Sequence, residues 1–266
     1  MRRWPDSEHS LNGRKETVLR HAIRALMVTS DSALLTTFAE ISREIGIEAQ
    51  ASVARRGIPE ELSDAKYEAV LLDFDTVPEA MPILAAVRQS HSNENAVVFA
   101  VASDAAQGQA VLEKGANVVV ERPVEPKRIR RALYAGYDLM VRERRRYFRC
   151  AVELPVLLIQ SGSGADFRCS SINVSRNGIA VSTPSAFKPG EEVQVVFLLP
   201  NTGLIIRALG AVVWDDKHGK TGVSFKCGNP QHQNDLDAWL DARLHEYLDA
   251  AHLGRKYSRS AARKES

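Results

Sequence analysis

The first half of the chain alternates short apolar runs with stretches of helical periodicity. In the stretch 31–46, Leu34, Phe38 and Ile41 recur at helical spacing, and Gly46 follows as a stop signal. Five such alternations of strand and helix predict a doubly wound (βα)5 fold with a parallel sheet covered on both faces. Functional groups in this fold gather at the carboxyl ends of the strands. The apolar runs that we interpret as strands lie at residues 24–28, 48–54, 68–74, 95–103 and 116–123.

From residue 151 onward the hydrophobic period changes to two. Six strand-like runs are separated by turn sequences such as SGSG, KPG, PNTG and KHGK, which predicts a six-stranded, closed or nearly closed antiparallel β-barrel. A C-terminal helix is expected after the barrel. Its apolar residues form one stripe that can cap the barrel or pair with a second copy of the chain, and they are Leu236, Trp239, Leu240, Leu244, Tyr247 and Leu248.

Length and charge limit the classes of function. The 266 residues suffice for two domains, and a net charge of +2 is too small for a protein that binds nucleic acid over its whole surface. Cys150, Cys169 and Cys227 lack CxxC spacing, so we expect reduced thiols rather than a disulfide frame or a zinc site. No metal site and no cofactor are expected.

The polar N-terminus lacks the apolar segment of a signal peptide, and no stretch approaches the roughly 20 apolar residues of a membrane span. We therefore expect a cytoplasmic protein. Residues 1–17 are expected to form a disordered tail, and residues 251–266 a disordered basic tail.

An arginine cluster stands where the two patterns meet, in the sequence RRRYFRCAVELPV at residues 144–156. Arg145 and Arg149 have the spacing Arg-x-x-x-Arg. Solvated linker charge is the simpler interpretation of Arg142 and Arg144. Arg146 stays open, because Arg142 and Arg146 have the same spacing in a worse register with the following strand.

A second motif follows in the sequence NVSRNG, where Asn173, Ser175 and Gly178 fit the pattern [Asp/Asn]-x-Ser-x-x-Gly. In this order and ahead of barrel strands, the two motifs resemble the PilZ domain, a receptor for the bacterial second messenger cyclic di-GMP, and we assign residues 143–250 to it. A hairpin turn alone would also explain Asn173 and Gly178. The resemblance implies that cyclic di-GMP is the ligand and that the ligand-binding residues come from Arg144, Arg145, Arg146, Arg149, Asn173, Ser175 and Gly178.

The chemistry of these residue types fits that ligand. Arginine has a permanent charge and a planar fork that matches a phosphate or the edge of guanine. The Asn173 amide can meet a guanine edge, and the Ser175 hydroxyl can meet a phosphate or base. Gly178 permits close approach of the backbone. Trp214 is interpreted as a barrel residue, in the core or on the rim.

The sequences YEAVLLDFD and EKGANVVVERPVEP resemble parts of a response-regulator receiver domain, which we place at residues 18–142. Asp73 matches the position of the phosphoacceptor. Thr29 and Ser30 stand where the family has acidic Mg²⁺ ligands, and Arg122 replaces the lysine before proline. Since Mg²⁺ prefers carboxylate oxygens, we expect a degenerate receiver that dimerises or relays a signal. Asp73 is then a possible phosphoacceptor or simply a polar residue at a strand end.

The leading hypothesis is a non-enzymatic cyclic di-GMP receptor that couples ligand binding to a receiver-like interaction domain. Protein partners are expected, and the chain can form a homo-oligomer through the receiver-like domain or the C-terminal helix. One alternative is a phosphorylation-driven response regulator with a PilZ output. Another is a nucleic-acid-binding regulator that uses the basic residues where the two patterns meet. No helix-turn-helix follows these residues, so we do not expect nucleic acid as a partner. No nucleophile–base pair or Gly-rich phosphate loop indicates an enzyme.

Overall fold

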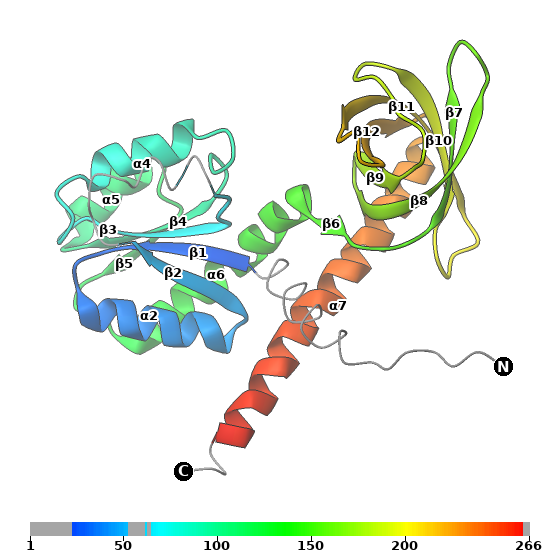
Figure 1. Cartoon of the computed structure of the whole chain (residues 1–266). Helices are drawn as coiled ribbons and strands as arrows, with labels where there is room; N and C mark the ends of the chain where they lie inside the picture. Colours follow the sequence, from blue (N-terminus) through cyan, green and yellow to red (C-terminus); the bar gives the residue numbers. More distant parts are fainter. Residues whose placement is uncertain (1–22, 53–61, 63–64, 263–266) are drawn as a thin grey trace. The chain divides into compact units, whose positions relative to one another are not determined.

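The chain divides into two compact units, one formed by residues 1–145 together with 247–266 and the other by residues 146–246. The computed structural model describes residues 23–52, 62 and 65–262, with side chains described up to residue 250 (Figure 1). The tail expected at residues 1–17 lies outside the described residues.

The first unit contains a five-stranded parallel sheet with the strand order β2-β1-β3-β4-β5. This order is typical of the doubly wound fold of receiver domains, so the expected (βα)5 architecture is confirmed. The strands are β1 (Ile23–Val28), β2 (Ile47–Ser52), β3 (Ala69–Asp73), β4 (Val97–Ala102) and β5 (Val118–Glu121). The helices of this unit are α2 (Ser32–Glu44), α4 (Ala80–Gln89), α5 (Ala105–Glu113) and α6 (Pro126–Tyr147).

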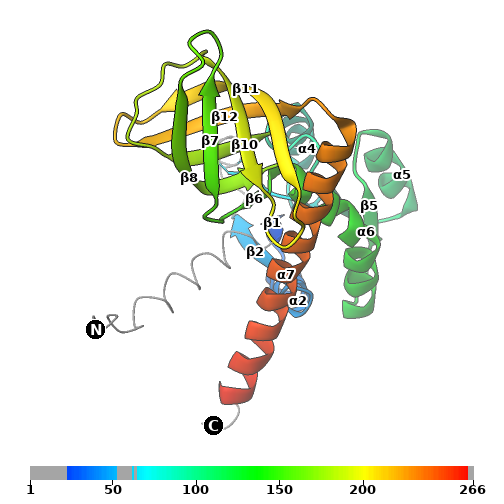
Figure 2. The ribbon, with the colours of Figure 1, turned by 90° about the vertical axis from the view of Figure 1, so that its right-hand side faces the viewer.

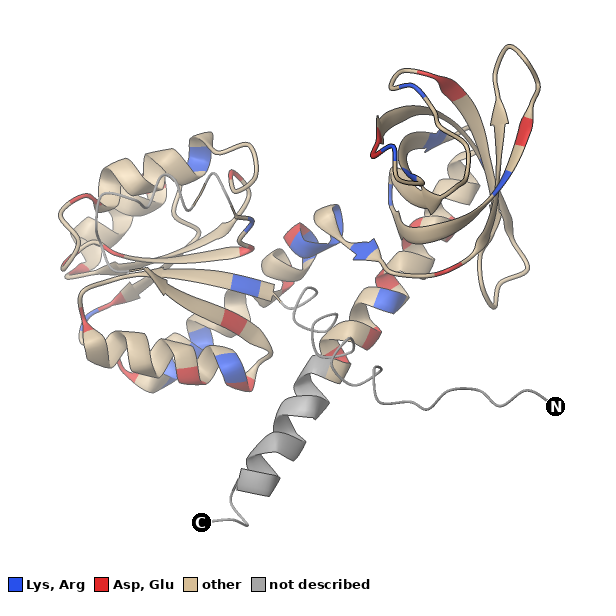
Figure 3. Cartoon of the chain, in the orientation of Figure 1, with Lys and Arg blue, Asp and Glu red and all other residues tan. Residues whose placement is uncertain are grey.

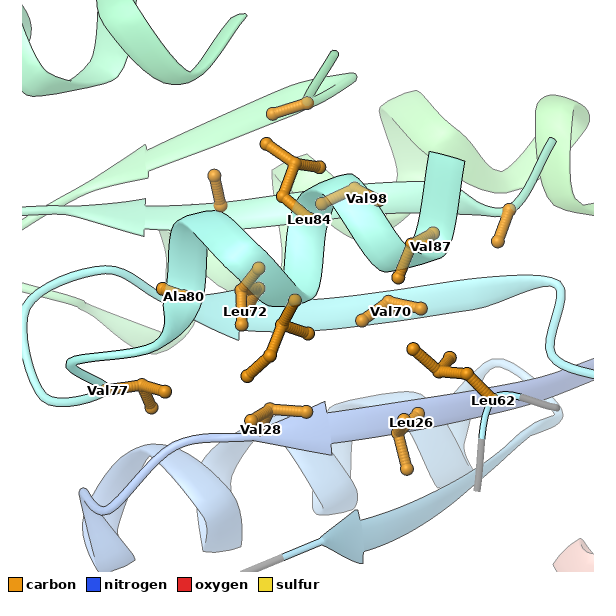
Figure 4. Close-up of a cluster of buried hydrophobic side chains, with 14 of the residues drawn as sticks. Leu26, Val28, Leu62, Val70, Leu72, Val77, Ala80, Leu84, Val87 and Val98 are labelled. Carbon is orange, nitrogen blue, oxygen red and sulfur yellow. The ribbon is translucent and has the colours of Figure 1, made fainter. Parts of the chain in front are cut away.

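Helices cover both faces of the sheet, α4 and α5 on one side and α2 and α6 on the other (Figure 1). Under α4, Val70, Leu72 and Val98 of the central strands meet Leu84 and Val87 of the helix, and all five are at most 1% exposed (Figure 4). The strands are apolar on both faces because both faces are covered.

On the opposite face, α6 lies close to β4. A Cβ atom at Gly136 would come within 2.6 Å of the Phe99 ring, so only glycine allows this approach. The Phe99 ring also makes an edge contact with Phe38 of α2, with ring centroids 6.3 Å apart. This packing fixes the path of α6 along the sheet.

The second unit is a β-barrel. Its strands are β6 (Arg149–Cys150), β7 (Pro155–Gln160), β8 (Asp166–Ser175), β9 (Gly178–Ser182), β10 (Glu192–Leu198), β11 (Ile205–Asp215) and β12 (Lys220–Cys227). They follow the order β6-β8-β7-β10-β11-β12-β9, and an additional β8–β9 pairing closes the last six into a ring (Figure 1). Figure 2 shows the barrel from the side. The expected six-stranded antiparallel barrel is thus confirmed, and the two-residue strand β6 adds to its edge at β8.

Alternation along the strands fills the barrel. On β10, Val193, Val195 and Phe197 are buried, and Phe197 lies 6.1 Å from Phe225 of β12 between ring centroids. Among the strands described for this unit, closing the ring leaves only β6 with an unpaired edge, because each barrel strand has a neighbour on both sides.

The chain continues into α7 (Pro230–Ala262), a helix longer than expected from the sequence. Residues 251–262, expected to belong to a disordered tail, continue this helix instead. Their sequence explains the difference, because it holds many good helix formers and no proline. None of the described helices combines the length and apolar composition that crossing a membrane requires.

Candidate ligand-binding site

A cavity of about 580 Å³ lies in the barrel unit. Ligand sites for small molecules commonly have such volumes. The residues that line it are Arg146, Arg149, Ser175, Arg176, Asn177, Gly178, Ile179, Ala180, Val213, Trp214, Gly222, Val223 and Ser224. Three of them are arginines and none is acidic, so the cavity has the electrostatic character of a site for an anion.

Strand register brings the two sequence motifs together at this cavity. Arg149 of β6 lies opposite Ser175 of β8, and Ser175 lies opposite Gly178 of β9. Gly178 in turn lies opposite Ser224 of β12, so one row of lining residues crosses four strands. The short strand β6 matters for this reason, because it places an arginine beside a serine that follows 26 positions later in the sequence.

The turn between β8 and β9 is held firmly. The Ser175 hydroxyl donates a hydrogen bond to the Gly178 carbonyl at 3.0 Å, and the Phe225 amide donates to the Asn177 carbonyl at 2.9 Å. A Cβ atom at Gly178 would lie 3.1 Å from the Val223 carbonyl oxygen, so a larger residue would push the turn away from β12. Ser175 and Gly178 therefore shape the site as well as line it.

A second row of residues runs beside the first. Asn173 lies opposite Ala180, Ala180 opposite Gly222, and Gly222 opposite Trp214. The Trp214 indole is 42% exposed and covers Gly222 so closely that a Cβ atom there would lie 2.1 Å from the indole Nε1. Trp214 thus stands on the barrel rim as an aromatic wall of the cavity.

Asn173 is not among the lining residues, but its side chain has an unusual state. Its Oδ1 atom is buried and has no hydrogen-bond partner among the described residues. An acceptor left in this state costs free energy, which a ligand with N–H groups can recover.

The arginines of the cluster do not share one environment. Arg149 is exposed, and its guanidinium makes no hydrogen bond or ion pair within the described part of the chain. Arg146 is also exposed and lines the cavity. Arg145 is exposed but is not among the lining residues. Basic residues occupy the last turn of α6 and β6 (Figure 3).

Arg144 differs most from the expectation. It is 8% exposed and belongs to the first unit, where its Nη1 lies 3.3 Å from Oε1 of Glu68. Glu68 is fully buried and also accepts a hydrogen bond from the Arg24 amide at 2.7 Å. Burial raises the pKa of the Glu68 carboxyl, and the Arg144 charge opposes that rise. Arg144 is placed by the need to balance a buried carboxylate, and it does not reach the cavity.

A second ion pair joins the end of α6 to the same segment before β3. Lys66, just before β3, contacts Glu143 of α6 at 2.5 Å, and its Nζ also donates to the Ser92 carbonyl at 2.6 Å. The end of α6 is therefore attached to the first unit by Glu143 and Arg144, which lie three and two residues before the start of the barrel unit at Arg146.

Arg176 and Trp214 are among the lining residues to which the sequence alone assigned no ligand-binding role. Arg176 occupies a variable position of the second motif and forms an ion pair with Asp237 of α7 at 2.6 Å. Trp214 ends the apolar run of β11, a pattern that fits core and rim equally well. A β-bulge between Val212 and Trp214 turns Val213 and Trp214 toward the cavity, and hydrophobic alternation does not reveal a bulge.

Asp73 lies in a separate ionic cluster at the carboxyl end of β3 in the first unit. Its side chain is fully buried, and its Oδ2 atom accepts hydrogen bonds from Thr29 and Thr76, each at 2.7 Å, and from Arg122 at 2.9 Å. Its Oδ1 atom accepts from the Asp75 amide at 3.1 Å. Both oxygens of the possible phosphoacceptor are thus already engaged.

Arg122 is the centre of this cluster, because its guanidinium pairs with Asp31 at 3.0 Å, Asp73 at 2.9 Å and Asp75 at 2.9 Å. The Leu34 amide and Arg122 lower the pKa of Asp31, which is also the N-cap of α2. Desolvation alone would lower the pKa of Arg122. The hydrogen bond to Asp31 and the three carboxylate charges outweigh desolvation, so the pKa of Arg122 is raised overall. Within the described ranges, no group of three or more His, Cys, Asp or Glu side chains is arranged to hold a metal ion.

Comparison with known families identifies the barrel unit. Residues 143–242 match the family model described as "PilZ domain". A comparison with curated proteins gives no match.

Solved structures similar to parts of the chain include both fold types. The inhibitor of motility MotI/DgrA of Bacillus subtilis is 22% identical with a TM-score of 0.33, and the match covers 37% of this chain and 50% of that one, so this chain spans half its length. The chemotaxis response regulator CheY4 of Vibrio cholerae is 14% identical with a TM-score of 0.40, covering 43% and 98%. The PilZ domain of CeSA from a cellulose-synthesizing bacterium is 14% identical with a TM-score of 0.28, covering 41% and 98%.

The family match and the barrel topology agree on the second unit, and the strand order β2-β1-β3-β4-β5 defines the first. Residues 143–242 therefore belong to the PilZ domain family, and they follow a domain with a receiver-like fold.

Proposed function

We propose that this protein is a non-enzymatic, cytoplasmic receptor for cyclic di-GMP, which binds in the barrel cavity. The observation that carries the proposal is the register of β6, β8 and β9. It sets Arg149 of the first motif directly beside Ser175 of the second, with Gly178 next in the same row, on the wall of a cavity lined by three arginines. The PilZ family match supports the same ligand.

The ligand's chemistry fits the residues at the cavity. Cyclic di-GMP has two phosphodiester anions and two guanines, and a guanidinium forks onto a phosphate or onto the O6/N7 edge of guanine. Asn173 offers an acceptor, without a partner among the described residues, to the N–H groups of guanine. Trp214 offers a flat apolar face at the rim. Arg149 is the residue on which we expect binding to depend most.

Calorimetry with cyclic di-GMP tests the proposal. We expect Arg149→Ala to weaken binding at least tenfold, since a charge-assisted hydrogen bond contributes about 1.5–3 kcal/mol. Arg207→Ala is the matched control, because Arg207 is an exposed barrel arginine outside the cavity and its loss should leave the affinity unchanged. Binding by Arg149→Ala equal to that of the wild type would mean that the ligand site is elsewhere.

Cyclic di-AMP tests the role of Asn173, because it has the same two phosphates without the guanine edges. We expect cyclic di-AMP to bind more weakly than cyclic di-GMP, and Asn173→Ala to reduce this difference. Duplex DNA distinguishes the nucleic-acid alternative, since DNA binding through many phosphates would fall steeply with salt and that of a two-phosphate ligand only gently.

We also propose that binding is coupled to the receiver-like unit, which acts as the interaction domain, through α6. Glu143 and Arg144 of this helix pair with residues of the first unit, and Arg146 lines the cavity. A ligand that orders Arg146 and Arg149 would therefore act on backbone that is continuous with those pairs. Hydrogen exchange tests this: amides across residues 140–152 should gain protection with cyclic di-GMP. Protection confined to the turn at residues 173–178 would contradict the coupling.

A further inference from the structure

Arg176 both lines the ligand cavity and forms an ion pair with a carboxylate of α7. It occupies the tight turn between Ser175 and Gly178, and it lines the cavity. Its Nη2 atom also lies 2.6 Å from Oδ2 of Asp237 on α7. The Arg176 side chain is 59% exposed and that of Asp237 is 24% exposed, so the pair is open to solvent on the arginine side.

Asp237 is fixed more firmly than Arg176. Gln233, one turn earlier on α7, donates a hydrogen bond from Nε2 to Oδ1 of Asp237 at 3.0 Å. The same Gln233 atom donates to the Arg176 carbonyl at 3.0 Å, which ties the turn to the helix. The neighbouring residues Leu236 and Leu240 are buried, so the helix cannot rotate freely. The carboxylate is therefore held on the helix by a second hydrogen bond, whereas more than half of the arginine side chain is exposed to solvent.

We propose that Arg176 is a further ligand-binding arginine, and that Asp237 is a built-in anion that competes with the ligand for it. This inference rests on the proposed function and adds one contact and one competitor to the same site. An exposed ion pair contributes little to stability, so a ligand can displace it. A phosphate accepts two parallel hydrogen bonds from a guanidinium, which is the stronger arrangement. Arg176 thus exchanges the Asp237 carboxylate for a ligand phosphate.

The exchange has a defined consequence for the affinity. Without ligand, the Asp237 carboxylate neutralises Arg176, and breaking this pair is a cost included in every binding event. With ligand bound, Asp237 is a negative charge left near a phosphate. Removing the charge of Asp237 should therefore tighten binding. If Asp237 merely held Arg176 in position, the same change would weaken binding instead.

Calorimetry with cyclic di-GMP at low salt tests the inference on the full chain. We expect Arg176→Ala to weaken binding about tenfold, as loss of a charge-assisted contact does, and Asp237→Asn to tighten it about threefold, as removal of an exposed pair allows. Asp235→Asn is the matched control, because it removes the same charge from α7 at a residue that bonds Gln231 instead. Its affinity should equal that of the wild type. In the Arg176→Ala background, the gain from Asp237→Asn should be smaller.

Two outcomes would overturn this inference while leaving the proposed function intact, provided that Arg149→Ala loses binding. One is unchanged binding by Arg176→Ala, and the other is unchanged or weaker binding by Asp237→Asn. No binding by the wild type would overturn both proposals. A measurement on the wild-type protein avoids the risk that a variant misfolds. The guanidinium NMR signals of Arg176 should shift when cyclic di-GMP is added. Unchanged signals would contradict the exchange.

Discussion

Arginine stands at the centre of two sites in this protein, and the two sites differ in where the anions come from. In the receiver-like unit, one guanidinium, that of Arg122, contacts three carboxylates of its own chain. In the barrel unit, three arginines line one cavity and no acidic residue lines it. A site whose anions are internal is complete without a ligand, whereas a cavity lined by arginines and by no acidic residue is suited to an anion from outside.

The backbone that carries each site explains the difference. Asp73 ends a buried parallel strand, and Arg122 follows the end of another, so the sheet forces their side chains to one edge. Arg149 and Arg176 lie on a two-residue strand and in a turn, both at the surface of the barrel. The first site is held together by hydrogen bonds and ion pairs and is partly desolvated, while the second is open to solvent and to a ligand.

The largest expected effect comes from removing the central cation of the first site. Arg122→Met leaves Asp73 buried without a counter-charge, and loss of one partner of a buried pair costs about 3–5 kcal/mol. Urea unfolding measures the loss. Arg130→Met is the matched control, because Arg130 forms an exposed pair with Glu44 and its loss should cost much less stability.

The same variant also tests whether the three carboxylates can bind a metal ion. Without Arg122, three carboxylates remain together, so millimolar Mg²⁺ should raise the melting temperature of Arg122→Met more than that of the wild type. Equal destabilisation by Arg122→Met and Arg130→Met would show that the cluster does not stabilise the fold.

A smaller effect is expected in the barrel from Gly222→Ala. The new methyl group would meet the Trp214 indole at 2.1 Å and displace it from the cavity wall. Such overpacking costs about 1–3 kcal/mol, and the affinity for cyclic di-GMP should fall as well. Gly228→Ala has open space around its Cβ position and should change neither quantity. If a folded Gly222→Ala variant bound cyclic di-GMP with wild-type affinity, Trp214 would not be part of the binding site.

The pH dependence of stability should show the internal pairing of the first site. The pKa of Asp31 is lowered in the folded protein, so its contribution is present above the ordinary pKa of 3.8 and is lost as the pH falls through the folded value. Asp31→Asn should therefore flatten the fall of stability below about pH 4. Thermal melts across this range measure it, and parallel curves for variant and wild type would contradict the assignment.

No effect at all is expected from acetyl phosphate with Mg²⁺. Both oxygens of Asp73 already accept hydrogen bonds, and Thr29 occupies a position where the receiver family has an acidic metal ligand. Intact-mass measurement should show no increase of about 80 Da. A mass increase that disappears in Asp73→Asn would show that Asp73 accepts a phosphoryl group, and the first site would then also take an anion from outside.

Hydrophobic periodicity was sufficient to predict both architectures, because a doubly covered parallel sheet and an antiparallel barrel require different periods. The register of β6 was not predictable, since a strand of only two residues carries no period. Arg144 and Arg146 have the same sequence character, yet one is buried beside Glu68 and the other lines the cavity. The side of α6 on which each arginine lies and the position of Glu68 decide which arginine is buried. Neither is a local property of the sequence.

The division of the chain into units has a consequence for how the protein can be dissected. The first unit consists of residues 1–145 and 247–266, so the barrel is an insert whose two ends both continue into helical segments of that unit. A stop codon after Arg145 would remove the barrel but also a segment that belongs to the remaining unit. A single proteolytic cut within the barrel would leave each fragment attached to part of the first unit. Clean removal of the barrel requires an internal deletion of residues 146–246 with a linker that joins the two helices.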